Sequence, residues 1–545
     1  MTEVTAAPDG ADTLGERAFD LLVTNAAAVL GGLRDEQYEV VEGTSIGIVG
    51  QRIQWIGPGS SLGDRTGAQT IDARGMLAVP GLINTHNHLF QNLVKGLGDE
   101  MYLLPWVETL ILPTANEMSP EETYLGAMLG CLEAIRSGTT ALMDFMFGVP
   151  DIEVHRAVLR AMRDSGIRGF FGRATRDLNP DSGWRDPWYL PLDEVFDQMR
   201  QLAREFPSGL PVSSVLPAPG TVRTMTVDGL LQVKEYARSE GSQITIHMGE
   251  YTEERDAAID RWGIGAFHKG EEIGFLGPEV VAAHCVKLDE AELEIVARTG
   301  TQVSFNPVSN AYLGNGAAPI TRMLELGIDV SLATDGGACA NTEDMLEAMK
   351  FGLLMQKSAV QDPRVLNARD ILRLATVGGA RALGLPADLG ALEVGRLADF
   401  FLFDPYRLKS VPMHEPLSTL VYAGEQSNVD TVVIDGKVVL EGGRFASIDE
   451  EAFVREVHDR ALSLSQRIGT FRLAEGRRFT PFGYDRIRSD TLARSASAEH
   501  TGQTALDNVD SGPATPGEGG VERAGADRVL STQQPHLSSS QRPEG

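Results

Sequence analysis

The sequence predicts an α/β protein built on a (β/α)₈, TIM-type barrel, with a small composite β-sandwich domain formed by both ends of the chain. Three observations support this prediction. Eight short apolar runs alternate with longer helical segments in the middle of the chain. Residues 19–78 are rich in short β-like runs, and runs of the same kind return within 385–447.

The eight apolar runs have the length and residue types of buried strands. In order they are LAVPGLINTH, TTALMDF, IRGFFGRAT, PVSSVLPAP, QITIHMGE, EVVAAHC, TQVSFNP and IDVSLATDG. Helical segments between them, such as PEETYLGAMLGCLEAIRSG and DEAELEIVARTG, end in glycine, the preferred helix stop. Eight strand–helix units indicate a barrel. A doubly wound open sheet is the alternative, but no glycine-rich phosphate loop follows the first run.

Composition divides the chain into segments. We expect a flexible leader at 1–18, the composite β-sandwich at 19–78 and 385–447, the barrel at 79–384, a helical extension at 448–484 and a disordered tail at 485–545. The tail has no Phe, Trp or Tyr after Tyr484. Such a segment buries too little apolar surface to offset its ordering entropy.

The net charge and the cysteine content indicate which binding partners and which cellular compartment to expect. The formal net charge is −28, which disfavours binding to a nucleic-acid backbone. The three cysteines form no CxxC pair, which fits a reducing cytosol. The first residues are polar and acidic, unlike a signal peptide, and no apolar run reaches the ~20 residues of a membrane span. We expect a cytoplasmic homo-oligomer without nucleic-acid or membrane partners.

Residues suited to bind a metal stand at the ends of several predicted strands. His86 and His88 are two apart at the end of the first strand, so period-two alternation sends both imidazoles into the barrel mouth. His247 ends the fifth strand, His284 the sixth and Asp335 the eighth. These are the strand ends at which a barrel of this kind places its active site.

The motifs PGLINTHNHLFQ, IHMGE, AHC, NPVSNAYLG and LATDGG resemble the amidohydrolase superfamily, in particular its metal-dependent aminohydrolase and chlorohydrolase branch. The resemblance runs from about residue 20 to 470. It implies one divalent metal per chain, zinc or iron, held by His86, His88, His247 and Asp335. It further implies Glu250 as proton shuttle and His284 hydrogen-bonded to the metal-bound water, so the expected catalytic residues are Glu250, His284 and Asp335. The predicted fourth strand ends without a lysine or acid that could bridge a second metal.

The expected reaction is attack of metal-bound hydroxide on an amino-substituted nitrogen heterocycle of triazine, purine or pyrimidine type, with release of ammonia. Relatives that act on adenosyl compounds carry a Glu where this chain has Ala115, which favours a substrate without a sugar. Gln91, Trp106, Asn310 and Asn341 are the candidate substrate-binding residues.

Other functions remain open at this point. Hydrolytic dechlorination and opening of an amide ring use the same nucleophile with a different leaving group, and nucleoside deamination of the adenosylhomocysteine type is a further alternative. A catalytically dead scaffold is disfavoured, because the four implied ligands and Glu250 are all present.

Overall fold

The computed structural model describes residues 18–33, 37–178, 188–207, 212–446 and 448–474. The tail predicted at 485–545, nearly all of the leader predicted at 1–18 and the last part of the predicted helical extension lie outside the described residues.

Two four-stranded parallel sheets form the centre of the molecule, with strand orders β6-β7-β8-β9 and β10-β11-β12-β13. The strands are β6 (Leu82–Asn87), β7 (Thr139–Met146), β8 (Arg168–Thr175), β9 (Val212–Pro219), β10 (Ile244–Met248), β11 (Val280–His284), β12 (Gln302–Phe305) and β13 (Val330–Leu332). Each of the eight predicted runs overlaps one of them. The two sheets adjoin twice, because β9 lies beside β10 and β13 lies beside β6.

The first predicted run is two strands. It divides at Gly81 into β5 (Leu77–Pro80), which belongs to a different sheet, and β6. A Cβ at Gly81 would come within 2.0 Å of the Thr140 hydroxyl oxygen, so only glycine allows this close approach to β7. The terminal sheet therefore extends to Pro80, two residues beyond the predicted boundary at 78.

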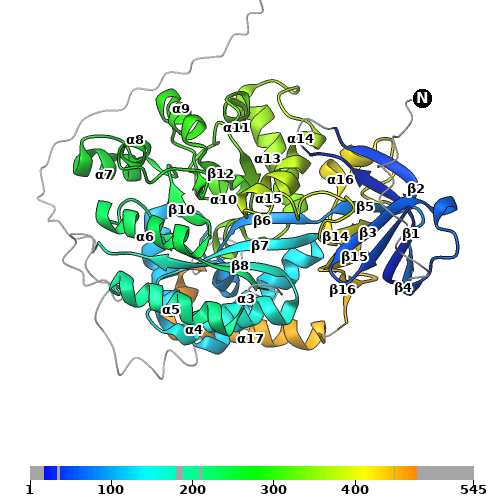
Figure 1. Ribbon diagram of the computed structural model, residues 1–545. Helices are drawn as coiled ribbons and strands as arrows, with labels where there is room; N and C mark the ends of the chain where they lie inside the picture. The colour runs from blue at the N-terminus through cyan, green and yellow to red at the C-terminus, as the bar shows by residue number, and fades with distance from the viewer. Residues whose placement is uncertain (1–17, 34–36, 179–187, 208–211, 447, 475–545) are drawn as a thin grey trace, which may run out of the picture. The chain divides into compact units, whose positions relative to one another are not determined.

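Helices follow the strands and cover the central sheets (Figure 1). Between β6 and β10 they are η2 (Leu89–Val94), α1 (Leu103–Trp106), η3 (Val107–Ile111), α2 (Leu112–Glu117), α3 (Pro120–Arg136), α4 (Ile152–Ser165), α5 (Leu192–Glu205) and α6 (Val227–Glu240). After β10 come α7 (Thr252–Trp262), α8 (Ala266–Glu272), α9 (Glu290–Thr299), α10 (Pro307–Tyr312) and α11 (Ile320–Glu325). After β13 come α12 (Gly337–Ala340), α13 (Met345–Val360), α14 (Ala368–Arg373), η4 (Leu374–Gly378) and α15 (Gly379–Ala382).

Glycines end several of these helices, as the sequence predicts. Gly166, Gly241 and Gly300 cap α4, α6 and α9 in the left-handed region, with φ of 79°, 65° and 72°.

The two chain ends build one nine-stranded sheet, seen as blue and yellow strands in Figure 1. Its order is β17-β16-β15-β14-β5-β1-β2-β3, and β4 pairs with β1. The strands are β1 (Phe19–Leu30), β2 (Glu39–Val49), β3 (Arg52–Pro58), β4 (Gly67–Asp72), β14 (Phe400–Phe403), β15 (Val429–Ile434), β16 (Lys437–Glu441) and β17 (Arg444–Phe445). One hydrogen-bonded path thus links strands from both chain ends. Short helices η1 (Gly59–Ser61), α16 (Pro416–Ala423) and η5 (Gln426–Asn428) connect them, and α17 (Glu450–Ile468) and η6 (Thr470–Ala474) follow.

Asn25 divides β1 between two partners. Its φ of 61° bends the strand, so that residues before it pair with β4 and residues after it pair with β5. The Asn25 amide donates a 2.8 Å hydrogen bond to Asp72 Oδ1, which holds the bend to the end of β4.

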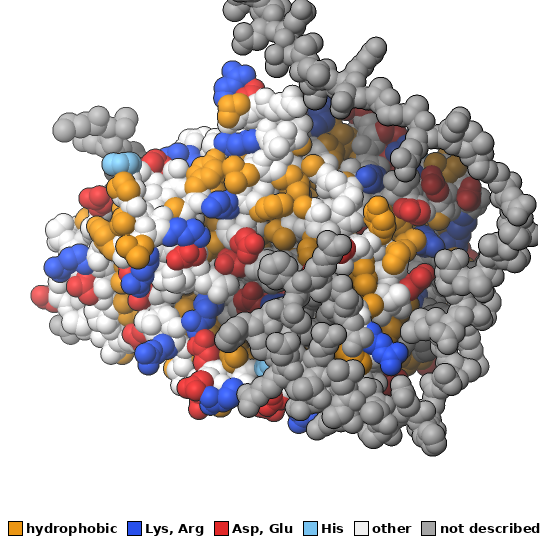
Figure 2. All heavy atoms as spheres, turned by 180° about the vertical axis from the view of Figure 1, so that it is seen from behind, with side chains coloured by type: hydrophobic (Ala, Val, Ile, Leu, Met, Phe, Trp, Pro, Cys, Tyr) orange, Lys and Arg blue, Asp and Glu red, His pale blue; other side chains and the backbone are white. Residues whose placement is uncertain are grey.

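The surface carries both signs of charge. On the face in Figure 2, described Lys and Arg side chains are interspersed with Asp and Glu, and hydrophobic side chains form small groups between them. No helix among the described residues combines the length and the apolar character needed to cross a membrane.

A buried ion-pair cluster joins the central sheets to the terminal sheet. Arg168, at the start of β8, donates to both Asp399 oxygens at 2.9 and 3.0 Å and also to Asp435. All three side chains are at most 5% exposed. Because Asp399 and Asp435 precede and follow strands of the terminal sheet, this one guanidinium fixes that sheet against β8.

Replacing Arg168 by alanine should lower the free energy of unfolding by about 3–5 kcal/mol, because two carboxylates would remain buried without a counter-charge. Urea unfolding followed by circular dichroism measures this loss. As a control, Arg163→Ala removes an exposed pair with Asp164 and should cost at most ~1 kcal/mol. Equal, small losses in both variants would contradict the assigned role of Arg168.

Candidate active site

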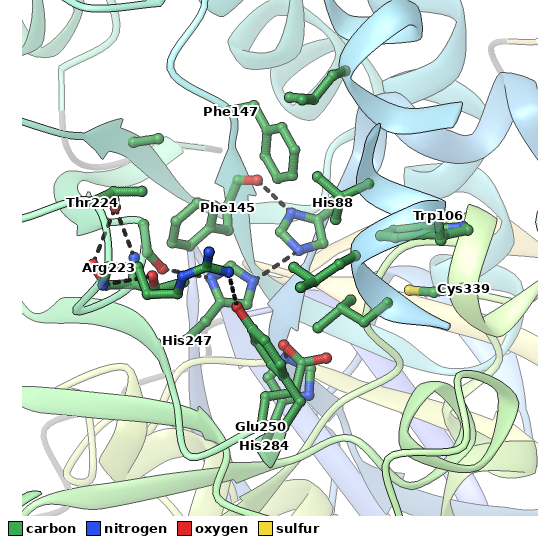
Figure 3. A pocket seen from close by; sticks show the side chains of 18 of the residues that line it. His88, Trp106, Phe145, Phe147, Arg223, Thr224, His247, Glu250, His284 and Cys339 are labelled. Atoms are coloured by element: carbon green, nitrogen blue, oxygen red, sulfur yellow. Dashed lines mark hydrogen bonds and ion pairs between the residues drawn. The ribbon is translucent and has the colours of Figure 1, made fainter. Parts of the chain in front are cut away.

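A cavity of about 230 Å³ opens where the central strands end. His88, His247, His284, Glu250 and Asp335 line its floor, and the walls are largely apolar and aromatic (Figure 3). These five residues come from β10, β11 and the segments that follow β6, β10 and β13. The strand-end residues predicted from the sequence are therefore brought together at one place.

Three imidazoles stand close to one another. His88 Nδ1 lies 2.7 Å from the Phe145 carbonyl oxygen and His247 Nδ1 lies 3.1 Å from that of Gly220. With each Nδ1–H donating to its carbonyl, both Nε2 atoms keep a free lone pair, and they lie only 3.2 Å apart. Both ring nitrogens of His86 are buried without a hydrogen-bond partner. Lone pairs this close are stabilised by a cation placed between them.

Asp335 completes the cluster. Its Oδ1 lies 3.6 Å from His86 Nε2 and 3.4 Å from His88 Nε2. Potential ligand atoms form two compact groups, one from His86, His88 and His247 and one from His86, His284 and Asp335. Within each group the atoms all lie within 4.8 Å of one another. Burial and neighbouring imidazoles lower the pKa of His86 and His247 well below the ordinary value. The imidazoles are then neutral, which is the form that binds metals. The residues thus fit a divalent metal.

Glu250 and His284 lie beside this cluster. His284 Nε2 is 3.7 Å from Glu250 Oε2 and 3.8 Å from Asp335 Oδ2. Burial raises the pKa of Glu250 to about 7, although Asn315 donates a 2.9 Å hydrogen bond to Oε1. A carboxyl group with a pKa near neutrality can both accept and release a proton in one cycle.

The backbone is strained at these strand ends. His284, Cys285 and Asp335 have φ of 77°, 50° and 67°, a region that residues with a side chain rarely adopt. Strain of this kind persists only where surrounding contacts impose it, and it is concentrated at functional sites.

Comparison with known proteins shows the family to which the chain belongs. Residues 77–439 match the model of the Amidohydrolase family. This protein belongs to the amidohydrolase family.

Among curated amidohydrolase relatives, the chain is 35% identical to a 5'-deoxyadenosine deaminase of Methanosarcina mazei, over 73% of this chain and 89% of that protein. It is 36% identical to a 5-methylthioadenosine/S-adenosylhomocysteine deaminase of Pelotomaculum thermopropionicum, over 77% and 94%.

Solved structures agree with this assignment. An adenosine deaminase from Xanthomonas campestris with bound zinc matches with a TM-score of 0.75 and 26% identity, over 84% of this chain and 100% of that one. Atrazine chlorohydrolase from Arthrobacter aurescens TC1, complexed with zinc, matches with a TM-score of 0.75 and 26% identity, over 81% and 100%.

Of the four candidate substrate-binding residues, Trp106 lines the cavity of this amidohydrolase. Its indole Nε1 donates to the Ala338 carbonyl oxygen at 3.3 Å, so the ring is held between α1 and α12.

The other three candidates lie outside the cavity lining. Asn310 Oδ1 lies 2.9 Å from His284 Nδ1, behind the imidazole. Asn341 Oδ1 accepts a hydrogen bond from the Gly96 amide and ties two loops together. Gln91 is fully buried beside Gly336, with no partner for its amide. Their spacing from the histidines does not fix the direction in which each side chain points.

Most residues of the cavity walls were not predicted from the sequence. These are Leu103, Leu104, Val107, Leu112, Phe145, Phe147, Arg176, Trp188, Arg223 and Tyr251. Phe145 and Phe147 repeat the period-two spacing of His86 and His88 at the end of β7, a signal that could have identified them. Arg223 donates to the Tyr251 hydroxyl at 3.0 Å across the cavity edge. The loop residues carry no comparable pattern.

Glu254 supports Glu250 from behind. It lies in the first turn of α7, is almost completely buried, and accepts a 3.0 Å hydrogen bond from the Glu250 amide through Oε2. Burial and the adjacent Glu250 charge raise the pKa of Glu254 to about 8. A pKa this high favours the protonated carboxyl group at neutral pH.

The substitution Glu254→Gln should stabilise the protein increasingly as the pH rises. The folded pKa of about 8 exceeds the ordinary value of 4.5, so wild-type folding takes up a proton between these values and loses stability with rising pH. Glutamine has no such proton to lose, and its carbonyl can still accept from the Glu250 amide. Urea unfolding of variant and wild type from pH 4.5 to about 8 measures the difference.

The control is Glu253→Gln, an exposed residue of the same turn, for which no growing difference is expected. A stability difference for Glu254→Gln that stays constant with pH would show that Glu254 is ionised in the folded protein.

Proposed function

We propose that this amidohydrolase removes an amino group from an aromatic nitrogen heterocycle by hydrolysis, releasing ammonia. The observation that carries the proposal is the placement of Glu250, a buried carboxyl group of raised pKa, beside the His–Asp cluster on the floor of an apolar cavity. The deaminase names of the curated relatives support it.

His86, His88, His247 and Asp335 would hold one divalent metal. The lone pairs of the imidazoles and the buried His86 nitrogens without partners support this ligand set. Such a metal lowers the pKa of water toward ~7 and so supplies hydroxide at neutral pH. Bound zinc in two neighbouring structures favours zinc over iron.

The side chains then divide the proton transfers. Glu250 takes a proton from the attacking water and returns it to a ring nitrogen, so the attacked carbon becomes tetrahedral without building up charge on the ring. His284 Nε2 accepts a hydrogen bond from the water and orients it in the tautomer whose Nδ1–H donates to Asn310 Oδ1, 2.9 Å away. The Asn306 side-chain nitrogen lies farther from Nδ1, at 3.2 Å. Asp335 Oδ2 passes the second proton to the amino group. The carbon–nitrogen bond then breaks and ammonia leaves.

The cavity walls provide the binding surface for a flat ring. Trp106, Phe147 and Trp188 offer aromatic faces, and several leucines extend the apolar wall. Aromatic and apolar surfaces of this kind bind planar heterocycles, while a few polar groups orient them.

We also propose that the two central sheets form one closed eight-stranded barrel, the domain predicted at 79–384, which begins at β6 because Val79 and Pro80 belong to the terminal sheet. The contacts of β9 with β10 and of β13 with β6 support closure. The hydrogen bond from the Asp335 amide to the His86 carbonyl oxygen, at 3.1 Å, joins the second seam at the site itself. The nine-stranded sheet would be the composite domain. A cytoplasmic homo-oligomer stays a prediction.

Two alternatives use the same machinery. Displacement of chloride is favoured by the structural similarity to atrazine chlorohydrolase. Deamination of a 5'-substituted adenosine is favoured by the curated relatives. Against a ribose site, Ala115 is buried in α2 away from the cavity, and the carboxylates in the described part of the lining are Glu250 and Asp335, both at the reacting end.

A substrate panel tests the proposal. Aminotriazines, aminopurines, aminopyrimidines, 5'-substituted adenosines and chlorotriazines are scored for ammonia and chloride release, with metal content measured on the same samples. We expect ammonia release from an aminated ring and about one metal per chain. His86→Ala should lack both metal and activity. Chloride release without ammonia release would replace the proposal with the first alternative.

The substitution Glu250→Gln should lower kcat by at least ~10³-fold, roughly 4 kcal/mol of barrier. Glutamine keeps the size of the side chain but cannot accept and return a proton. Steady-state kinetics beside metal analysis measures the effect, and metal content should stay normal. Lost metal would make Glu250 a ligand, and near-normal turnover would move the proton transfer to another group.

A further inference from the structure

A fully buried polar cluster lies behind the active site, on the outer side of β6 and β13. The strand alternation that directs His86 and His88 toward the His–Asp cluster directs Asn87, between them, to the opposite side. Thr334 immediately precedes Asp335. Asn87 and Thr334 both reach Glu343, a residue between α12 and α13, and all three side chains are 0% exposed.

The Glu343 carboxylate receives three donors. The Asn87 amide and the Thr334 hydroxyl, the latter at 3.0 Å, both donate to Oε2. The Asn92 amide donates to Oε1 at 3.0 Å. Burial raises the pKa of Glu343 to about 8, while Lys95 and the hydrogen bonds from Asn87 and Asn92 act to lower it. The ionised form accepts all three bonds at once, whereas no neutral side chain of the same size offers as many acceptor sites.

Thr334 is held from a second direction. Its backbone amide donates to Asn84 Oδ1 at 3.2 Å, and its hydroxyl accepts from Asn84 Nδ2 at 2.7 Å. The Thr334 hydroxyl can therefore accept from Asn84 while it donates to Glu343. These bonds fix the residue next to Asp335, whose φ of 67° needs outside support.

Glu343 itself is anchored by neighbouring helices. Its backbone amide donates to Glu133 Oε1 of α3 at 3.1 Å, and Glu133 pairs with Lys95. Its carboxylate thus stands at a fixed point between the end of β6 and the end of β13. One residue contacts the neighbours of three of the four implied ligands without lining the cavity.

We propose that Glu343 is a positioning residue that sets the separation of His86 and His88 from Asp335, and thereby the affinity of the site for its metal. This inference rests on the proposed metal site. Residues that orient ligands from behind contribute about 10–100-fold to metal affinity in metalloproteins. Glu343 would act through Asn87 and Thr334, and not by contact with substrate.

The test is a zinc-competition measurement on the full-length zinc-loaded enzyme with a chromogenic chelator. Glu343→Gln replaces one acceptor by a donor that faces other donors, so the zinc affinity should fall about 10–100-fold. The matched control is Glu347→Gln, an exposed residue one helical turn away that changes the charge equally, and it should bind zinc as the wild type does.

Thr334→Val is the second variant. It keeps the branched shape and replaces the hydroxyl group by a methyl group, so it should fold and weaken zinc binding in the same direction. A lower melting temperature with unchanged zinc affinity in both variants would overturn the inference and leave Glu343 a structural residue. A wild-type enzyme that binds no zinc or iron would instead overturn the proposed metal site, and the inference with it.

Discussion

Desolvation is the constraint on which the rest of this structure depends. Parallel strands end together, so four imidazoles and the carboxyl groups of Glu250 and Asp335 share one site, where all of them are buried except the partly buried His247. Each polar group buried there needs a partner, and the partners are largely backbone carbonyls and amide side chains. Phe145 and Gly220 accept from imidazoles, and Asn315 donates to Glu250. The reactive atoms are the imidazole nitrogens and carboxyl oxygens that this arrangement leaves without a hydrogen-bond partner.

The need to keep these polar side chains together also explains the unusual backbone conformation. A regular strand would continue past His284 and Asp335 and carry their side chains away from the cavity. The left-handed conformation at these residues turns the chain sharply instead, so each side chain stays on the floor of the cavity while the backbone departs toward the next helix. The hydrogen bonds of Asn310 and Thr334 hold these turns in place.

The sequence predicted the floor of the site better than its walls. His86, His88, His247, His284 and Asp335 end apolar runs, and strand direction alone decides where such residues lie. Trp188 and Arg223 lie on loops whose paths depend on distant packing, so no local pattern identifies them. Gln91 was proposed from its spacing to His88 and Asn310 from its place after the seventh strand; Asn310 contacts His284, and Gln91 is buried beside Gly336. The β-rich chain ends predicted a composite domain, but a break as small as Gly81 is set by the neighbouring Thr140.

The pairing of β5 with β14 has a consequence for synthesis on the ribosome. Leu77–Pro80 hydrogen-bonds on one side to Phe400–Phe403, which leaves the ribosome only after more than half of the chain has followed. Until then β5 presents an open edge of apolar residues, immediately before the strand that carries His86 and His88. Such edges are where growing chains associate with one another. This edge therefore stays unpaired for as long as the ribosome takes to translate residues 81–403.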